Sequence, residues 1–224
     1  MQQTPAHEQH NPELLSLIPE RSGYLVEIGC SSGALAREFK KKNAAVHYVG
    51  VDISAEYIEQ AKRYCDEHVV LDMDVAEDAF FDQHGQADCW VFGDTLEHLK
   101  DPWTLLARIR QRLPKHGVLV ACIPNMQHWS IQARLACGDL RYEDQGLLDR
   151  THLRWFTRQT IIELFVSTGY EIDAGIPRVF NQPEAAPILE QIRHMAKVLG
   201  VQEDMAVQDA LPLQYVIRAK PGQA

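Results

Sequence analysis

The sequence predicts an α/β protein whose largely parallel, doubly wound sheet is covered by helices on both faces. Short apolar runs alternate with segments of helical periodicity along most of the chain. Such runs are typical of buried strands, and parallel neighbours need the crossover helices that the intervening segments supply. The 224 residues suffice for one domain of this kind, and no linker rich in Gly, Ser or Pro divides them.

The expected elements follow in order along the chain. Residues 1–12 are expected to form a flexible tail, and Asn11-Pro12 to open a short helix that Pro19 ends. Ser54 and Asp101-Pro102 are typical starts of two later helices. We expect strands over 24–29, 46–53, 68–75, 87–94, 117–124, 170–180 and 212–220. We expect helices over 34–42, 55–65, 103–113, 158–169 and 184–200. The final strand could enter the sheet antiparallel, at or near its edge.

Composition narrows the class of protein. The formal net charge is −9, from 22 basic and 31 acidic side chains, so nucleic acid is a poor partner. No run of about 18 apolar residues could span a bilayer, and the N-terminus lacks the apolar core of a signal peptide. The five cysteines are scattered and form no CxxC pair, which favours buried thiols in a reducing cytoplasm over a zinc site.

The stretch VEIGCSSGALAREF (26–39) predicts a ligand site. Gly29 and Gly33 lie between an expected strand and an expected helix, where glycine permits positive φ and close approach of a ligand to the backbone. The helix N-terminus adds unpaired N–H groups and partial positive charge. Because ligands of open α/β sheets bind at the carboxyl ends of strands, we expect one over the end of this strand.

The spacing indicates which ligand this is. A dinucleotide fingerprint needs G-x-G-x-x-G, but Ser31 stands where the second glycine should be. A P-loop also fails, since no Gly-Lys-Ser/Thr follows. What remains is E-x-G-x-x-x-G, with a second acid, Asp52, at the end of the next strand. A carboxylate there can accept both ribose hydroxyls of an adenosine ligand that has no pyrophosphate.

With these motifs the chain resembles the class I S-adenosylmethionine (SAM)-dependent methyltransferases. The resemblance covers roughly residues 11–180 and the last strand, and residues 138–157 are similar to small bacterial members linked with O-antigen, other glycan or secondary-metabolite pathways. It implies a Rossmann-like, seven-stranded sheet with an antiparallel last strand. Ser31 replaces the commoner glycine, but it is small and binding is expected to survive. The matching segments are VEIGCSSG, VGVDIS, the acidic end of the third strand and FGDTLEHLKDP.

The resemblance assigns cofactor-binding roles to strand ends. Glu27 corresponds to the acid that helps to hold the methionine end of SAM, and Gly29 and Gly33 let this moiety lie on the loop. Asp52 matches the ribose-binding acid, with Ile53 against the adenine.

Further matches extend this cofactor site. Asp74 and Val75 match the pair near the adenine amino edge, although Asp72 is a competing alignment. Asp94 ends the fourth strand beside the expected sulfonium. Cys30, a small residue of the turn, completes the predicted set.

Methyl transfer to a hydroxyl also needs a base, because a neutral alcohol is a poor nucleophile. His152 and His98 are the candidates, with Asp149 placed to orient the imidazole of His152 if they share a turn. An alternative is that Asp149, Arg150 and Arg154 form a salt-bridge latch that holds the long segment 125–157 on the sheet. No convincing metal-ligand cluster is visible in the sequence, so no metal is predicted.

The sequence therefore predicts a cytoplasmic SAM-dependent methyltransferase that forms S-adenosylhomocysteine as product. The small-molecule acceptor is expected to present an oxygen of a sugar or similar metabolite, such as a nucleotide-sugar or glycan precursor, bound by the variable segments 125–157 and 181–211. Alternatives are N-methylation of a small molecule, a non-catalytic SAM-binding regulator, or a nicotinamide oxidoreductase, which Ser31 disfavours. The helix over 184–200 is expected to form a lid, to mediate a homodimer contact or simply to cover the sheet.

Overall fold

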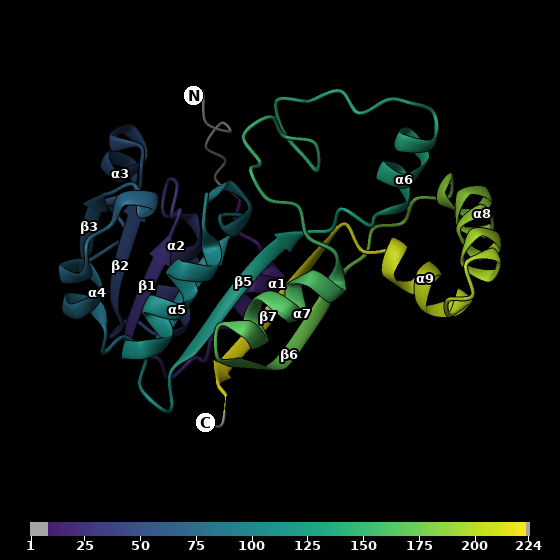
Figure 1. The fold of residues 1–224 in the computed structure, drawn as a ribbon. Helices are drawn as coiled ribbons and strands as arrows, with labels where there is room; N and C mark the ends of the chain where they lie inside the picture. Colours follow the sequence, from purple (N-terminus) through teal and green to yellow (C-terminus); the bar gives the residue numbers. More distant parts are fainter. Residues whose placement is uncertain (1–8, 223–224) are drawn as a thin grey trace.

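The computed structural model describes residues 9–222, which form a seven-stranded sheet with helices on both faces (Figure 1). The strand order is β3-β2-β1-β4-β5-β7-β6; β1 to β5 are parallel and β7 is antiparallel to both of its neighbours. The predicted fold class, including the antiparallel last strand next to the sheet edge, is confirmed. The strands are β1 (Tyr24–Ile28), β2 (His47–Asp52), β3 (Glu67–Val70), β4 (Cys89–Gly93), β5 (Val118–Pro124), β6 (Tyr170–Arg178) and β7 (Gln214–Pro221).

Helices occupy the crossovers and the segments beyond β5. They are α1 (Pro12–Leu17), α2 (Ala34–Lys42), α3 (Ala55–Ala61), α4 (Asp78–His84), α5 (Pro102–Arg112), α6 (Trp129–Ala136), α7 (Arg158–Ser167), α8 (Ala185–Val198) and α9 (Glu203–Ala210). Two short 3-10 helices, η1 (Met73–Val75) and η2 (Leu96–His98), follow β3 and β4. None of the helices within residues 9–222 is both long and apolar enough to cross a membrane.

The helix starts predicted from capping residues are confirmed. The Asn11 side chain accepts a hydrogen bond from Leu14 N (3.0 Å), and Asp101 Oδ1 accepts one from Thr104 N (3.0 Å). Ser54 caps α3 in the same way through Tyr57 N (3.3 Å). These side chains satisfy backbone donors that have no partner within the helix.

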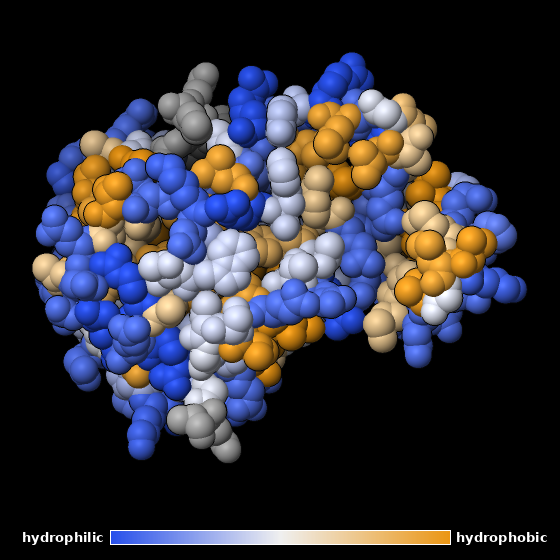
Figure 2. Space-filling view, in the orientation of Figure 1, coloured by the Kyte–Doolittle hydropathy of each residue, from blue (hydrophilic) through white to orange (hydrophobic). Residues whose placement is uncertain are grey.

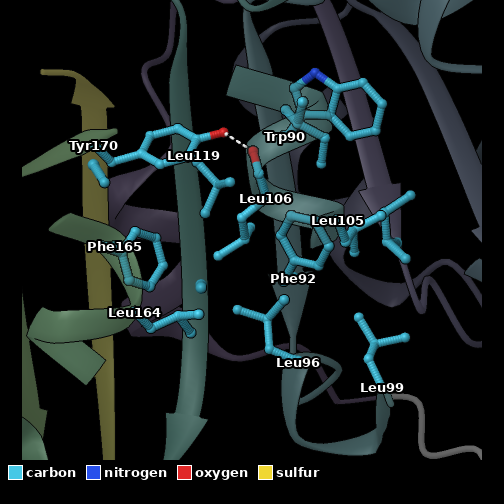
Figure 3. Close-up of a cluster of buried hydrophobic side chains, with 14 of the residues drawn as sticks. Trp90, Phe92, Leu96, Leu99, Leu105, Leu106, Leu119, Leu164, Phe165 and Tyr170 are labelled. Carbon is cyan, nitrogen blue, oxygen red and sulfur yellow. Dashed lines mark hydrogen bonds between the residues drawn. The ribbon is translucent and has the colours of Figure 1, made fainter. Parts of the chain in front are cut away.

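Two packed layers cover the sheet. On one face α4, α5 and α7 bury a large apolar cluster against β1, β4 and β5, and on the other α1, α2 and α3 bury a second cluster. Figure 3 shows part of the first cluster, where Leu164 and Phe165 of α7 lie opposite Phe92 and Leu106. Tyr170 closes this layer by donating its hydroxyl to the Leu106 carbonyl (3.0 Å). This hydrogen bond ties the start of β6 to α5.

Some boundaries differ from those predicted. The third strand ends at Val70, and the 3-10 turn η1 follows where the sequence predicted continued strand. The Asp72 carboxylate explains this turn, because Oδ1 accepts a hydrogen bond from Asp74 N (2.9 Å). The helix after Ser54 ends at Ala61 rather than at residue 65. Helices α4, α6 and α9 were not predicted, and residues 1–8 of the predicted tail lie outside the described part.

The two variable segments meet beyond the carboxyl end of β5. Helix α6 packs on α8, and α8 packs on α9, so that they project together from the sheet (Figure 1). Buried Asn125, directly after β5, donates two hydrogen bonds of 2.8 Å to the carbonyls of Asp209 and Pro212. Trp129 Nε1 joins the segments again through Gln182 Oε1 (2.9 Å). Segments distant in sequence are therefore fixed to one strand end.

Candidate active site

Backbone strain concentrates at the carboxyl ends of β1 and β4. Among the non-glycine residues within 9–222, positive φ angles occur at Ser31 (48°) and Asp94 (53°). These residues follow adjacent strands, at the point where the strand order changes direction. Left-handed backbone is costly for residues with a Cβ and persists mostly at functional sites. This edge is also where ligands of open α/β sheets bind, so the strain and the topology indicate the same place.

The loop after β1 has the conformation that the glycines predict. Gly29 and Gly33 have φ angles of 76° and 80°. A Cβ on Gly29 would lie 2.4 Å from Thr95 Oγ1, and one on Gly33 would lie 3.2 Å from the Cα of Ala61. Thr95 Oγ1 is itself fixed by donation to the Ile28 carbonyl (2.9 Å). The glycines are therefore required by the packing of the loop against its neighbours as well as by its turn.

Cys30 points away from the loop surface. Its side chain is buried, and a Cβ added to Gly50 beneath it would lie 3.0 Å from Cys30 Sγ and 2.7 Å from Cys65 Sγ. A hydrogen bond with the neighbouring Cys65 thiol, followed by burial, raises the pKa of the Cys30 thiol far above its usual range. The geometry leaves the backbone of Cys30, rather than its thiol, to face a ligand on the loop.

Asp52 connects the first two strand ends. It is 7% exposed, its Oδ2 accepts a hydrogen bond from Ser31 N (2.9 Å), and its Oδ1 accepts one from Ser54 N (2.9 Å). A carboxylate that accepts from the glycine loop lies at the edge where the sequence predicts the ribose. Asp52 is therefore well placed both to shape the loop and to accept hydroxyl donors.

Glu27 is a buried carboxyl in the middle of the sheet. It is 4% exposed, and the Tyr48 hydroxyl donates to its Oε2 (2.7 Å). Burial, opposed by the Tyr48 hydrogen bond and reinforced by the charge of Asp52, raises the pKa of Glu27 to about 8. At neutral pH the carboxyl is mostly protonated until a positive group approaches it.

The predicted adenine side contains exposed apolar residues. Ile53 directly follows the buried strand β2 and is 54% exposed, and Val75 lies in η1 and is 69% exposed. Asp74 lies in η1, where its Oδ1 accepts a hydrogen bond from Lys100 N (2.9 Å). This contact ties η1 to the segment after β4. The two exposed apolar side chains are of the kind that an aromatic base would cover.

Beyond β4, three titratable side chains come together. Glu97 and His98 lie in η2 and His152 lies in the long segment after β5, with one candidate ligand atom of each within 4.8 Å of the others. His152 Nε2 is 4.0 Å from Glu97 Oε1, and the two imidazole rings are 4.8 Å apart, edge to face. Glu97 is 1% exposed, and within the described residues 9–222 neither of its carboxyl oxygens has a hydrogen-bond partner.

Burial opposes ionisation of Glu97 and His152. Burial raises the pKa of Glu97 well above its usual range, and the charges of Asp94 and Asp149 raise it further. Burial, followed by the neighbouring His98, lowers the pKa of His152. The site thus holds an unpartnered carboxyl beside two imidazoles, in surroundings that favour an added positive charge.

The backbone attaches the long segment to η2. The Glu97 carbonyl accepts hydrogen bonds from Leu153 N (2.8 Å) and Arg154 N (2.9 Å). The Arg154 guanidinium donates to the Lys100 carbonyl, and Arg150 pairs with Asp144 (2.8 Å). The bonds of Leu153 and Arg154 hold the segment carrying His152 against the end of β4, whereas the Arg150–Asp144 pair lies within the segment.

Asp149 and His152 share a turn, since His152 N donates to the Asp149 carbonyl (3.0 Å). The Asp149 carboxylate accepts from Thr151 Oγ1 (2.7 Å), which in turn contacts His98 Nδ1 (3.0 Å). His152 Nδ1 lies 3.3 Å from the Leu147 carbonyl. Asp149 is therefore linked to His98 through Thr151, in addition to the predicted proximity to His152.

Three residues of the site were missed from sequence: Glu97, Thr95 and Thr151. Glu97 directly precedes His98 in a segment that follows a buried strand, and an acid at that position was a usable signal. Thr95 and Thr151 act through contacts with distant segments, for which a single sequence gives no signal.

Comparison with known proteins identifies the class. Residues 4–174 match the sequence profile of the family described as a methyltransferase domain. The chain therefore belongs to this methyltransferase family, and its predicted resemblance to class I SAM-dependent methyltransferases is confirmed. This membership decides against a nicotinamide oxidoreductase. None of the curated proteins compared with the chain is similar to it in sequence.

Solved structures share the fold at low sequence identity. A SAM-dependent methyltransferase from Listeria monocytogenes has a TM-score of 0.62 at 13% identity, covering 95% of this chain and 97% of the other. One from Archaeoglobus fulgidus has a TM-score of 0.62 at 16% identity, covering 93% and 91%. Magnesium protoporphyrin IX methyltransferase from Synechocystis PCC 6803, solved with bound S-adenosylhomocysteine, has a TM-score of 0.58 at 11% identity, covering 94% and 80%.

Proposed function

We propose that this SAM-dependent methyltransferase moves the methyl group to an oxygen of a small molecule, a sugar or a similar metabolite. The observation that carries the proposal is the convergence of two sites on one sheet edge. The predicted cofactor residues lie at the ends of β1 and β2, and the buried cluster of Glu97, His98 and His152 follows β4, the other neighbour of β1.

The cofactor roles follow this placement. Glu27 and the glycine loop would hold the methionine end of SAM, with Asp94 beside the sulfonium. Asp52 would accept the ribose hydroxyls, and the adenine would lie toward the 53 and 74–75 positions. Because the sulfonium is an activated leaving group, the main task of the protein is to align it with the acceptor and exclude water.

The acceptor side supports oxygen over nitrogen. A hydroxyl must lose its proton as the new C–O bond forms and the C–S bond breaks, whereas an amine can bind already deprotonated. His98 and His152 are the groups placed to take that proton, with Asp149 orienting His98 through Thr151. The segments 125–157 and 181–211, joined by Asn125 and Trp129, would form the acceptor pocket.

We propose that a homodimer contact would use the exposed side of α8 and α9. Hydrophobic residues gather at this end of the molecule in Figure 2. Met195 and Val198 of α8 and Leu199 directly after it are about half or more exposed. The five cysteines are all free thiols, four of them buried, which agrees with the expected cytoplasmic location.

The test is calorimetric titration of the full chain with SAM, S-adenosylhomocysteine and NAD. We expect micromolar binding of the two sulfur ligands, no binding of NAD, and loss of at least about tenfold in affinity for Asp52→Ala because the ribose loses its acceptor. Binding would justify an acceptor screen that begins with nucleotide-sugars and includes small amines. A folded protein that binds NAD instead would refute the proposal.

Asp88→Ala is the matched control for that variant. Asp88 Oδ2 also accepts two backbone hydrogen bonds, from Gly23 N (2.7 Å) and Tyr24 N (2.9 Å), but at the amino ends of the strands. It should lower stability as Asp52→Ala does, while leaving the affinity for SAM unchanged. Equal losses of affinity in both variants would mean that Asp52 acts only through folding.

A further inference from the structure

The proposed function assigns no role to the buried Glu97 carboxyl. Within residues 9–222 its two oxygens accept no hydrogen bond, and its one ion-pair partner is His152 at 4.0 Å. A buried carboxyl without partners is costly and is usually explained by a role in the site or by a bound ion. Its nearest neighbours are two imidazoles, which are among the commonest metal ligands.

The histidines are held as metal ligands usually are. His152 Nδ1 lies 3.3 Å from the Leu147 carbonyl, which fixes that nitrogen as the donor and leaves the Nε2 lone pair directed toward Glu97. His98 Nδ1 contacts the side chain (3.0 Å) and the carbonyl (3.3 Å) of Thr151. Metal-bound histidines commonly use their second nitrogen for such a hydrogen bond to a carbonyl or polar group.

The spacing is close to that of a coordinated ion. Metal–ligand bonds of 2.0–2.2 Å in a tetrahedral site separate ligand atoms by about 3.4 Å. The 4.0 Å between His152 Nε2 and Glu97 Oε1 would shorten to this value by small side-chain rotations. Both flanking backbones are already fixed, because the Glu97 carbonyl binds the amides of Leu153 and Arg154.

We propose that Glu97, His98 and His152 bind one divalent transition-metal ion and that its open coordination positions face the methyl acceptor. Two imidazoles and one carboxylate favour an ion of borderline softness, such as Zn²⁺, Mn²⁺ or Fe²⁺, over Mg²⁺ or Ca²⁺, which prefer oxygen ligands. Charge agrees with this assignment, since Asp94 and Asp149 add negative potential around the cluster.

The role of the ion deepens the proposed function and rests on it. An acceptor hydroxyl bound to the ion loses its proton to water more readily, because the cation stabilises the alkoxide. The alkoxide oxygen then forms the bond to the methyl carbon as the carbon–sulfur bond breaks, leaving neutral S-adenosylhomocysteine. The two histidines act on the acceptor through the ion in place of taking its proton directly.

The experiment measures metal binding without requiring an acceptor. The full chain is freed of metal with EDTA, and Co²⁺ is followed by its visible absorption while Zn²⁺ and Mn²⁺ are titrated calorimetrically. We expect one ion per chain with micromolar or tighter affinity, and a loss of at least about 100-fold for Glu97→Gln and for His152→Gln. Saturating Zn²⁺ should raise the unfolding temperature of the wild type and leave that of Glu97→Gln unchanged.

Glu67→Gln provides the matched control. Glu67 also lies beside two histidines, His47 (3.6 Å) and His84 (3.8 Å), but it is partly exposed and begins β3 at the opposite edge of the sheet. This variant should bind the ion as the wild type does. Glu97→Gln loses no hydrogen bond of the carboxyl, so it should fold, and thermal unfolding without metal verifies this.

The outcomes separate this site from the proposed function. Absence of stoichiometric binding, or equal binding by wild type and Glu97→Gln, would overturn the metal site. SAM is titrated into the same samples: binding of SAM without metal would leave the proposed function standing alone. Binding of metal without SAM would leave the metal site standing and remove the methyl donor.

Discussion

At the scale of single residues, two buried carboxyls near the carboxyl ends of β1 and β4 differ in their hydrogen bonding. The Glu27 carboxyl accepts a hydrogen bond from the Tyr48 hydroxyl, whereas no group in the described part of the chain donates one to the Glu97 carboxyl. Both have raised pKa values because burial disfavours their charged forms. Because an apolar residue would pack there at less cost, two such buried carboxyls near the carboxyl ends of the strands favour the functional site proposed there.

Glu27 gives a prediction about pH and stability. The pKa of Glu27 is raised to about 8 in the folded chain, against about 4.3 for an unperturbed glutamate, so the folded state holds the proton more tightly. The stabilising contribution of this proton is complete below about pH 4.3 and is lost as the pH rises toward 8. Glu27→Gln should remove this pH dependence. The free energy of unfolding of the variant should therefore increase relative to that of the wild type as the pH rises.

Urea unfolding at several pH values between 5 and 8 measures this difference. The gain should approach about 1.4 kcal/mol per pH unit across the window and then level off. A difference between the two proteins that does not change with pH would contradict the raised pKa.

The same variant should bind SAM more weakly, because a neutral amide cannot pair with the ammonium of the methionine moiety.

At the scale of elements, the first loop is determined by its contact with the end of β4. Gly29 combines a φ of 76° with the absence of space for a Cβ, since Thr95 Oγ1 would lie 2.4 Å away. Gly138 has nearly the same φ, 74°, but nothing lies within 4 Å of its Cβ position. A comparison of alanine substitutions at these two glycines therefore distinguishes the cost of left-handed backbone from the cost of steric overlap.

Alanine at these two positions should have unequal effects. Gly138→Ala should lower the free energy of unfolding by about 1 kcal/mol, the cost of left-handed backbone. Gly29→Ala should lower it by about 2–4 kcal/mol, because overpacking adds to the strain, and should weaken SAM binding. Chemical denaturation of both variants provides the measurement. Equal destabilisation would show that Thr95 moves freely and does not constrain the loop.

Some helices and strands could be predicted from the sequence, and others could not. The strands, the crossover helices α2, α3 and α5, and the capped starts at Asn11, Ser54 and Asp101 could be predicted because their signals are local. The turn η1 and helix α9 could not, because Asp72 competes with the strand ladder and because α9 buries little apolar surface beyond Ala210. Local pattern carries no information about such competition.

The candidate site also has a part that could be predicted from the sequence and a part that could not. The predicted positions Glu27, Gly29, Gly33 and Asp52 lie together because adjacent parallel strands end at one edge, which the strand order guarantees. The meeting of Glu97 with His152 depends on how a segment of more than 30 residues folds back after β5. The hydrogen bonds from Leu153 N and Arg154 N to the Glu97 carbonyl, together with the contact between Thr151 and His98, hold the segment in this position.

At the scale of the whole molecule, a rigid sheet supports a looser acceptor side. The sheet buries two apolar clusters, whereas α8 buries Ala185, Ile192 and Ala196, and α9 buries Ala210. Regions with few buried apolar contacts open at a lower free-energy cost than the core. We therefore expect the proposed acceptor side to open more easily than the strand ends that carry the proposed cofactor residues.

Hydrogen exchange tests this division of the molecule. Amides of α8 and α9 should exchange at least about tenfold faster than those of β1 and β4, because they open without unfolding the sheet. Saturating S-adenosylhomocysteine should slow exchange over 26–33 and 94–98 and leave α8 and α9 unchanged, since the proposed cofactor contacts lie on the strand ends. An acceptor found by screening should instead protect residues of 125–157 and 181–211. Uniform exchange across sheet and helices would contradict the division, and protection of α8 by the cofactor alone would place the cofactor on the acceptor side.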